Sequence, residues 1–530
     1  MVVAKKSEQQ FNRFGSIALR VFEVLTFCML VLSLVNLFVN SGMYRRIVSV
    51  DRKQTFLWMV LILAVFLLML HFVLHFSNLR AFLVKRKYWV LGIGMGCLFL
   101  FQLIFASITY TEIGWDCGAV VYASSTTPDQ FYFVVYPNNI MLAFLFKVAN
   151  KLAGLVGIHN IWAVSIGVNI LFTDIGIVFG ALICKKLFSN RTYYLCVLLM
   201  VAVIGLSPYI LVPYSDTMTL PFTTGIIWLI LLYRKQAALW KKVVLAFLLG
   251  GATLTGYYIK PTVVIIWVAY AIWWLLRKKG PVTKTGIIRL ACTLGAFLVA
   301  VGIVQGVQLI AKDKVLGSYN REDLIYQNEI PMSHFLMMGL YDDLERGLYG
   351  AFYSDDVSNT QAVVGKKAKT QYHMEVIKER LSEFGFKGFI KHLYHKYTWV
   401  TTDGTFFYGG EGGFHNNFPK TETGIRGTLQ NFTYCETPFY QQYYGQYLHG
   451  LWAVVLLGCS LFALFSIRKK QMDLAFVLQM SIFGIFLFLM LFEARSRYLF
   501  LYLPFFIILA SQGIVQTEQT ICNWLHKLKR

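Results

Sequence analysis

The chain has 530 residues, of which 57% are hydrophobic and only 14% are charged. Its mean hydropathy of +0.57 excludes an ordinary soluble globular protein and indicates a protein that crosses a membrane many times. The formal net charge of +22 is compatible with nucleic-acid binding, but Lys and Arg in such a chain collect in cytoplasmic loops beside anionic headgroups. We therefore expect membrane lipids as partners, and no nucleic acid.

Twelve apolar runs are long enough to cross a bilayer as helices, which takes about 17 to 25 residues. The first run follows Arg20 and lacks a small-residue cleavage site, so we expect a membrane helix and no removable signal peptide. We predict an all-α polytopic membrane protein with about twelve transmembrane helices. The runs lie near residues 20–40, 55–76, 89–110, 161–183, 193–212, 217–233, 242–258, 262–276, 287–311, 447–467, 473–492 and 497–514.

Basic residues between the runs predict which connections are cytoplasmic. With the amino terminus inside, five connections carry Lys and Arg clusters, as the positive-inside rule requires. We therefore expect a multi-pass protein of the cell membrane with both termini in the cytoplasm and the candidate site outside the cell. The clusters are Arg80, Lys85, Arg86 and Lys87; Lys185, Lys186 and Arg191; Arg234, Lys235, Lys241 and Lys242; Arg277, Lys278, Lys279, Lys284 and Arg289; and Arg468, Lys469 and Lys470.

Two stretches need separate treatment in this topology. Arg45, Arg46, Arg52 and Lys53 fall on the external side against the rule, so the orientation of the first helical hairpin stays open. The alternation of sides also requires that residues 139–156 do not cross the membrane. Their apolar run is shorter and carries basic residues on one side, which favours a helix lying in the external interface.

The predicted topology divides the chain into six parts. A segment as long as 312–447 is too long to be a structureless connection, so we expect an external α or mixed domain there. Within it, apolar spacing predicts a helix over 371–391, and the Gly-rich stretch 403–417 is typical of a mobile or ligand-covering loop. The parts are N-terminal transmembrane helices (1–110), a first external loop with the interface helix (111–160), central transmembrane helices (161–311), the external domain (312–447), C-terminal transmembrane helices (448–514) and a cytoplasmic tail (515–530).

The first large external loop carries acidic residues at the expected membrane surface. They are Glu112, Asp116 and Asp129. A carboxylate placed there can act as a base on a hydroxyl substrate, and Asp116 is our candidate. The alternative is that Asp116 belongs to a turn and has no catalytic role, because the residues of Trp-Asp-Cys-Gly also favour turns. Cys117 and Cys435 both fall in external regions, and the sequence leaves open whether they pair.

Three cationic residues fall at external helix ends, where an ionic lipid headgroup would lie. Lys260, in Tyr-Tyr-Ile-Lys-Pro-Thr, is either a phosphate ligand or a residue that extends to the interface at a proline-broken hairpin. Arg495 and Arg497, beside Glu493, suit forked binding of a phosphate, or else form an interfacial salt-bridge group. Together they predict a phosphate-binding site.

Two further carboxylates lie near predicted spans. Asp216 either caps the following helix or holds an acceptor hydroxyl as a second carboxylate. Asp174 lies near the middle of its span, too deep for external chemistry, so we expect it to bond to a neighbouring Asn or Thr.

Several of these motifs together resemble a known family. They are the external Asp after an early span, Tyr-Pro-Asn-Asn at 136–139, Ile-Lys-Pro at 259–261, the stretch 331–340 and Glu-Ala-Arg-Ser-Arg-Tyr at 493–498. This set resembles the GT-C glycosyltransferases, in particular Gram-positive bacterial relatives of the protein O-mannosyltransferase and aminoarabinose-transferase group. The likeness covers most of the chain in layout but only these motifs in sequence.

The resemblance implies a GT-C fold and an inverting transfer on the outer face of the membrane. A sugar would pass from a polyprenyl-phosphate donor to a wall polysaccharide, teichoic acid, glycolipid or protein. Asp116 would take the acceptor proton, while Lys260, Arg495 and Arg497 would hold the departing phosphate. Because these cations supply the positive charge, we expect no cofactor and no metal. Asp216, Tyr136, Asn138, Asn139, His334 and Glu493 would bind substrate, although Tyr-Pro-Asn-Asn stands where the mannosyltransferases have His-Pro-Pro.

Two other functions remain open from the sequence. A transporter that flips a lipid-linked sugar or polysaccharide would carry charges near the bilayer midplane, often within repeated halves. Here the ionic groups gather at external helix ends, which favours surface chemistry. A polysaccharide polymerase or ligase uses similar lipid donors, and the sequence does not separate it from the transferase.

Overall fold

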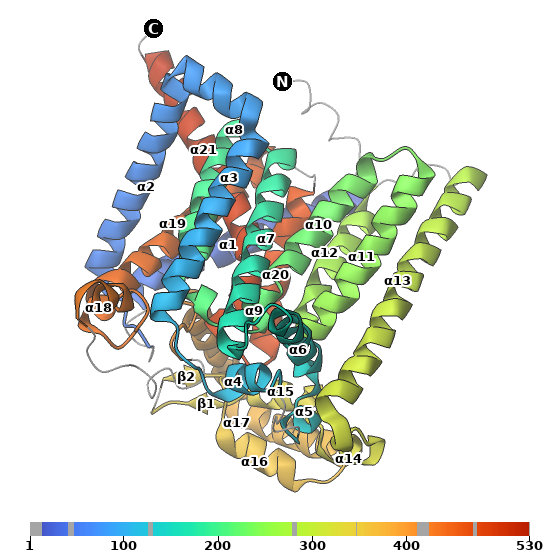
Figure 1. Cartoon of the computed structure of the whole chain (residues 1–530). Helices are drawn as coiled ribbons and strands as arrows, with labels where there is room; N and C mark the ends of the chain where they lie inside the picture. Colours follow the sequence, from blue (N-terminus) through green and yellow to red (C-terminus); the bar gives the residue numbers. More distant parts are fainter. Residues whose placement is uncertain are drawn as a thin grey trace.

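The structure, a computed structural model, describes residues 13–40, 47–125, 131–277, 283–345, 347–410, 423–469 and 474–528. Within these ranges the chain is helical apart from one short hairpin, in which β1 (Asp342–Asp343) pairs antiparallel with β2 (Leu348–Tyr349). Long helices run side by side as a bundle, and shorter helices cover one of its ends (Figure 1). The chain is an all-α polytopic membrane protein, as the sequence predicted.

Among the described residues, nine helices are long and apolar enough to cross a membrane, and three shorter apolar helices accompany them. Each of the twelve overlaps one of the predicted runs, and nine of them have the length and composition predicted for a span, whereas three are shorter. The helices are α1 (Arg13–Val39), α2 (Arg52–His75), α3 (Ser77–Thr109), α7 (Ile161–Leu187), α8 (Asn190–Met200), α10 (Leu220–Lys235), α11 (Leu239–Ile259), α12 (Val264–Leu276), α13 (Lys284–Leu316), α19 (Gly445–Lys469), α20 (Ala475–Leu491) and α21 (Leu503–Leu528).

The centre of the bundle is formed by α7, α19, α20 and α21, whose apolar side chains are largely buried. Small residues let these helices approach closely, as helices do inside membranes. A Cβ on Gly513 would lie 2.0 Å from the carbonyl oxygen of Gly458, so α19 and α21 touch backbone to backbone. In contrast, α2 and α13 expose most of their apolar side chains, as expected of helices that face lipid.

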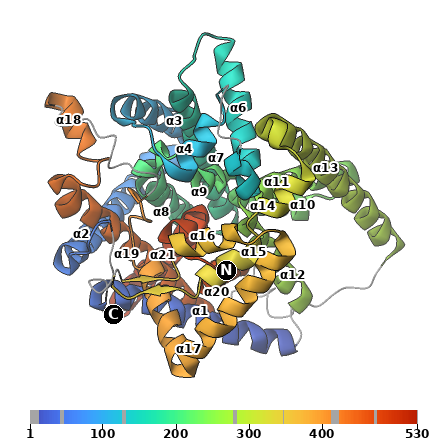
Figure 2. The same cartoon turned by 90° about the horizontal axis from the view of Figure 1, so that it is seen from below.

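The short helices gather at the end of the bundle opposite the C-terminal end of α21 (Figure 1), which we call the site end. Seen from that end, α14 to α17 lie across the bundle (Figure 2). Here the ends of several spans meet the segments that carry the candidate residues. The elements of the site end are α4 (Trp115–Tyr122), α5 (Phe131–Val135), η3 (Pro137–Asn139), α6 (Ile140–Gly154), α9 (Ser215–Met218), η6 (Pro261–Val263), η7 (Gly317–Tyr319), α14 (Glu322–Asn328), α15 (Met332–Met338), α16 (Ser354–Ala362), α17 (Lys366–Thr401), α18 (Gly424–Gln430) and η10 (Ser496–Tyr502).

The remaining expectations can be compared with these elements. The helix predicted over 371–391 is confirmed as part of α17. The mobile loop predicted from residue 403 is wrong for 403–410, because Asp403, Phe406 and Tyr408 are buried. No disulfide joins Cys117 to Cys435. Asp129, Arg45, Arg46 and the rest of the Gly-rich stretch lie outside the described residues.

Candidate functional site

Asp116 lies in the first turn of α4, at the site end of the bundle. The residue before it, Trp115, has a φ of 49°, a left-handed conformation that costs a bulky side chain energy and often marks a functional position. Gly118 allows the tight entry into the helix, since a Cβ there would lie 2.4 Å from the carbonyl oxygen of Ile113. The thiol of Cys117 donates to the carbonyl of Pro213 at 3.7 Å and so holds α4 against the segment before α9.

Two tyrosines and one amide surround the Asp116 carboxylate. Tyr132 donates to Asp116 Oδ1 at 2.7 Å, and Asn139 Nδ2 donates to the same Tyr132 hydroxyl at 2.7 Å. The Tyr214 hydroxyl lies 3.3 Å from Asp116 Oδ2 and 3.4 Å from Asn139 Oδ1. The carboxylate is therefore fixed in orientation, with one oxygen strongly bonded and the other more weakly held.

The tyrosines beside Asp116 are protonated donors. Burial, with the nearby Tyr214 and Asp116, raises the pKa of Tyr132 well above its usual value. Burial and the negative charges of Asp116 and Glu493 raise the pKa of Tyr136 to about 12. The Tyr136 ring lies 5.1 Å from the ring of Tyr132, the donor to Asp116.

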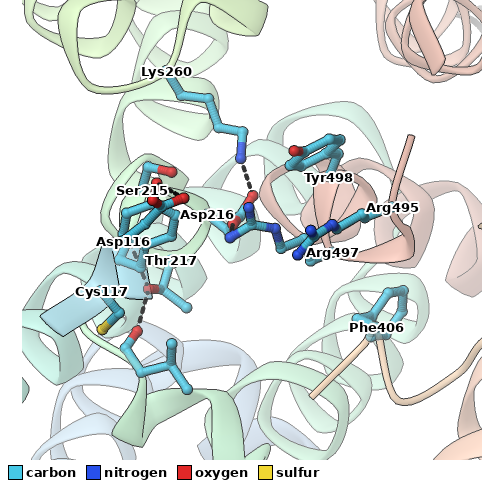
Figure 3. Close-up of polar contacts among 12 residues, drawn as sticks. Asp116, Cys117, Ser215, Asp216, Thr217, Lys260, Phe406, Arg495, Arg497 and Tyr498 are labelled. Atoms are coloured by element: carbon cyan, nitrogen blue, oxygen red, sulfur yellow. Dashed lines mark hydrogen bonds and ion pairs between the residues drawn. The ribbon is translucent and has the colours of Figure 1, made fainter. Parts of the chain in front are cut away.

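Asp216 forms ion pairs with two cations from distant parts of the chain. Lys260 Nζ donates to Asp216 Oδ1, and Arg497 Nη1 lies 3.6 Å from Asp216 Oδ2. Both cations also face Tyr498, with Lys260 Nζ 4.4 Å and Arg497 Cζ 5.1 Å from its ring centroid. Figure 3 shows Lys260, Arg497 and Tyr498 gathered around Asp216.

The local sequence explains how Lys260 reaches this place. Pro261 disfavours helical conformation in the residue before it, and Lys260 is extended, with φ −152° and ψ 110°. α11 therefore ends at Ile259, and the lysine leaves the helix. The Tyr502 hydroxyl donates to the carbonyl of Thr262 at 2.8 Å, which holds this turn against η10 and its arginines.

The second arginine is held by a different set of residues. Arg495 Nε lies 3.4 Å from Glu493 Oε1, and its guanidinium faces the rings of Phe407 and Phe352 at 5.1 and 5.8 Å. Between the arginines, Ser496 donates to Asp403 Oδ2 at 2.6 Å. Asp403 also accepts from the backbone N–H of Phe407 at 2.8 Å. The stretch after Asp403 is thus a support for the arginine segment.

We call Asp216, Lys260, Glu493, Arg495 and Arg497 the ionic cluster. Each of the five side chains belongs to a residue less than one-tenth exposed. Three are cationic and two are acidic, and the Asp403 carboxylate adjoins them through Ser496. Burying charge is costly unless a counter-charge is near, and each of the three cations pairs with a carboxylate of the cluster.

Three residues considered from the sequence lie away from the cluster or at its edge. Asn138 contacts Asn139 at 3.5 Å and reaches Asp116 only through it. The His334 ring is buried and hydrogen-bonded to Thr360 at 2.8 Å, inside the α15–α17 layer. Asp174 is bonded to Gln102 at 3.2 Å, so the expectation of an Asn or Thr partner is wrong. Among the described residues, no group of three or more His, Cys, Asp and Glu could hold a metal ion.

Comparison with known proteins places the chain in a family. A family model described as "conserved hypothetical integral membrane protein" matches residues 10–518. The chain belongs to this family. No curated protein matches it. Among solved structures, one titled "Crystal Structure of ArnT from Cupriavidus metallidurans in the apo state" is similar over 81% of this chain and 78% of its own, with 11% identity and a TM-score of 0.31. Values this low do not establish a shared fold.

Several residues of the site could not be singled out from the sequence. Tyr132 and Tyr214 are two of 30 tyrosines, and nothing in their spacing distinguishes them, while Tyr498 enters only as the last residue of the motif at 493–498. Asp403 was visible only as the start of a Gly-rich stretch. The sequence signal near Asp403 was the run of turn residues that follows it. In the structure this run has left-handed backbone at Phe406 and Phe407, with φ values of 53° and 62°.

Proposed function

We propose that this protein is a GT-C type glycosyltransferase that moves a sugar from a polyprenyl-phosphate donor to the hydroxyl of a cell-surface acceptor. The ionic cluster receives the phosphate, and Asp116 serves as the base. The observation that carries the proposal is the joining of these two groups through Tyr214. Its hydroxyl bonds to Asp116, and its ring lies 5.2 Å from the Arg497 guanidinium.

The departing phosphate gains charge as the sugar leaves. When the bond between sugar and phosphate breaks, the electron pair stays on the phosphate oxygen, and cations fixed nearby stabilise that charge. Arg497 and Lys260 share Asp216 as counter-ion before the donor binds. An incoming phosphate competes with Asp216 for these cations, and two guanidiniums suit its oxygens through forked hydrogen bonds.

On the other side of Tyr214, Asp116 acts on the acceptor. The acceptor hydroxyl attacks the sugar carbon from the face opposite the phosphate, and its proton passes to Asp116 Oδ2. This oxygen is the more weakly held of the two, at 3.3 Å from Tyr214, while Oδ1 keeps its bond to Tyr132. Attack opposite the leaving group inverts the configuration of the sugar. No step requires a cofactor.

The site lies at the bundle end opposite the C-terminal end of α21, and we propose that it faces the outside of the cell with both termini in the cytoplasm. The Lys and Arg clusters at the other end support this orientation through the positive-inside rule. A lipid donor would reach the cluster from the membrane, since its cations stand at the ends of spanning helices.

The experiment that tests this proposal measures cleavage of the lipid-linked sugar donor. Purified protein in lipid nanodiscs is incubated with a panel of polyprenyl-phosphate sugars and a cell-wall extract as acceptor, and the release of polyprenyl phosphate is followed by mass spectrometry. We expect release with at least one sugar and none from Asp116→Asn. Movement of the donor across a vesicle bilayer without cleavage would instead identify a transporter.

A further inference from the structure

A second concave region lies on the segment between α13 and α19, outside the ionic cluster. It is an open cavity of about 580 Å³ between α14 and the first turns of α17. Both helices lie at the site end of the bundle (Figure 2). The cavity is lined by Tyr326, Lys366, Lys367, Thr370, Gln371 and Met374.

The lining suits a sugar chain with negative groups. The Tyr326 ring is 52% exposed, and Met374 is 42% exposed, so apolar surface is available for the C–H face of a sugar ring. The amide of Gln371 and the hydroxyl of Thr370 can hydrogen-bond to sugar hydroxyls. Lys366 and Lys367 are exposed, and they outnumber Glu329, which lies 3.1 Å from Lys366.

The walls of the cavity are held in fixed positions. Lys369, which is buried, donates to the carbonyls of Asn328 and Glu329 at 2.9 and 3.3 Å. The backbone N–H of Gly365 donates to the carbonyl of Gln327 at 3.3 Å. These bonds join the end of α14 to the start of α17 just beneath the lining side chains. The cavity is therefore part of the fold and does not depend on side-chain rearrangement.

The same wall is connected to the surroundings of Asp116. The backbone N–H of Ile330, directly after the segment bonded to Lys369, donates to the carbonyl of Val135 at 3.1 Å. The next residue is Tyr136, whose ring lies 5.1 Å from that of Tyr132, and Tyr132 donates to Asp116 at 2.7 Å. A chain lying in the cavity thus borders the segment that leads to the base.

We infer that this cavity binds the acceptor, and that the acceptor is a glycan chain bearing phosphate or carboxylate groups. The inference that the bound glycan is the acceptor rests on the proposed transferase function. The inference that the cavity binds an anionic glycan does not. The aromatic ring and the amide recognise the sugar, and the two lysines select its charge. The cavity holds the chain so that its end extends along 328–330 toward Asp116.

The experiment measures binding separately from transfer. Full-length protein in nanodiscs is titrated, by calorimetry, with three oligosaccharides of equal length: one bearing phosphate, one bearing carboxylate and one neutral. We expect both anionic chains to bind about tenfold more tightly than the neutral one. Tyr326→Ala and Lys367→Gln are each expected to weaken anionic binding by about tenfold.

Lys378→Gln is the matched control, because Lys378 is exposed on the same helix but does not line the cavity. It is expected to leave binding unchanged. Since Tyr326 and Lys367 are exposed, we expect their variants to unfold at the same temperature as the unsubstituted protein. Thermal unfolding of all variants is measured in parallel. Equal affinity for the neutral chain, or unchanged anionic binding in both cavity variants, would overturn the inference.

The two proposals can fail separately. Anionic binding that is lost in the cavity variants, in a protein that cleaves no donor, would support the cavity and contradict the transferase. Transfer to an anionic acceptor with an unaltered acceptor KM in Tyr326→Ala and Lys367→Gln would support the transferase and contradict the cavity. Asp116→Asn should abolish transfer while leaving the affinity for the oligosaccharide as it was.

Discussion

The Tyr214 hydroxyl lies 3.3 Å from Asp116 Oδ2, and the face of the same ring lies 5.2 Å from the Arg497 guanidinium. One side chain therefore contacts both the candidate base and the candidate phosphate ligand. Cations bind aromatic faces, and a phenol donates well to a carboxylate, so each contact stabilises the position of the other. The relationship explains why residues almost 400 positions apart in the sequence can act on one substrate.

Replacing Asp116 by Asn removes the proton acceptor but keeps nearly the same shape. We expect the transfer rate to fall by about 10²- to 10⁴-fold, as for loss of a general base, while donor binding stays within a factor of about two. The matched control is Glu112→Gln, which removes a charge at an exposed residue just before α4. Rates are followed by release of polyprenyl phosphate. Normal turnover in Asp116→Asn would show that another group takes the proton.

Arg497→Lys keeps the positive charge but loses the planar fork that lies against two tyrosine rings. Its guanidinium is 5.2 Å from the Tyr214 centroid and 5.1 Å from that of Tyr498. We expect donor affinity to fall about tenfold, or about 1.4 kcal/mol, because Lys binds phosphate as a point charge. Arg191→Lys is the control, since Arg191 pairs with Glu518 at the end of the bundle that lies away from the site. Titration with a non-transferable donor analogue gives both values. Equal affinities would remove Arg497 from the phosphate site.

Gly350, which follows β2, lies against the segment that carries the two arginines. Its φ is 61°, and a Cβ would lie 2.5 Å from Lys396 Cε and 2.7 Å from the carbonyl oxygen of Gly339. Its own carbonyl accepts from the N–H of Ala494 at 2.8 Å. We expect Gly350→Ala to displace Ala494 and weaken donor binding, with a loss of stability of about 2 to 4 kcal/mol from clash and strain.

The control for this change is Gly385→Ala. Gly385 has a similar φ of 55°, but nothing lies within 4 Å of its Cβ position. It should show the backbone strain alone, about 1 to 3 kcal/mol, with donor binding unaffected. Thermal unfolding in nanodiscs and donor titration measure the two effects. If both variants bind donor equally well, the contact between Gly350 and Ala494 does not position the arginines.

The amino-acid pattern was sufficient to predict the spans and the charged members of the site. Most Lys and Arg clusters fall in the connections predicted to be cytoplasmic, so Lys260, Arg495 and Arg497, at the other ends of the apolar runs, stand out in the sequence itself. The pairing of Lys260 and Arg497 with Asp216 does not stand out, because ion pairs between distant segments depend on the packing of α9, α11 and η10. The pattern of runs and charges therefore predicts the side of the membrane on which a residue lies, but not its neighbours.

The tyrosines and His334 are residues whose contacts could not be predicted from the sequence. A protein with 16% aromatic residues uses most of them to pack helices, so the few that bond to Asp116 do not differ in pattern from the rest. Only the family resemblance assigns His334 to the substrate site. Its ring instead bonds to Thr360, which also contacts His373. These buried hydrogen bonds form only when α15, α16 and α17 are packed together. The sequence of any one of these helices therefore does not predict them.

That buried pair predicts acid sensitivity of the α15–α17 layer. Burial, together with neighbouring positive charge, lowers the pKa of His334 to about 3 and that of His373 to about 4. Both lie below the value of about 6.5 expected in the unfolded chain. Unfolding therefore takes up protons once the pH falls below about 6.5. Stability from the neutral rings is complete above that pH and decreases by about 1.4 kcal/mol per pH unit for each ring down to about pH 4.

Hydrogen exchange of α15–α17 at pH 7.5 and pH 5 measures this effect in the intact protein, after correction for the intrinsic rate at each pH. We expect faster opening of the layer at pH 5. His373→Gln should halve the pH dependence, because Gln can replace one hydrogen bond to Thr360 or Ser333 but does not titrate. His526→Gln, near the opposite end of the bundle, should leave it unchanged. An equal pH dependence in the parent and His373→Gln would mean that other groups control the stability of this layer.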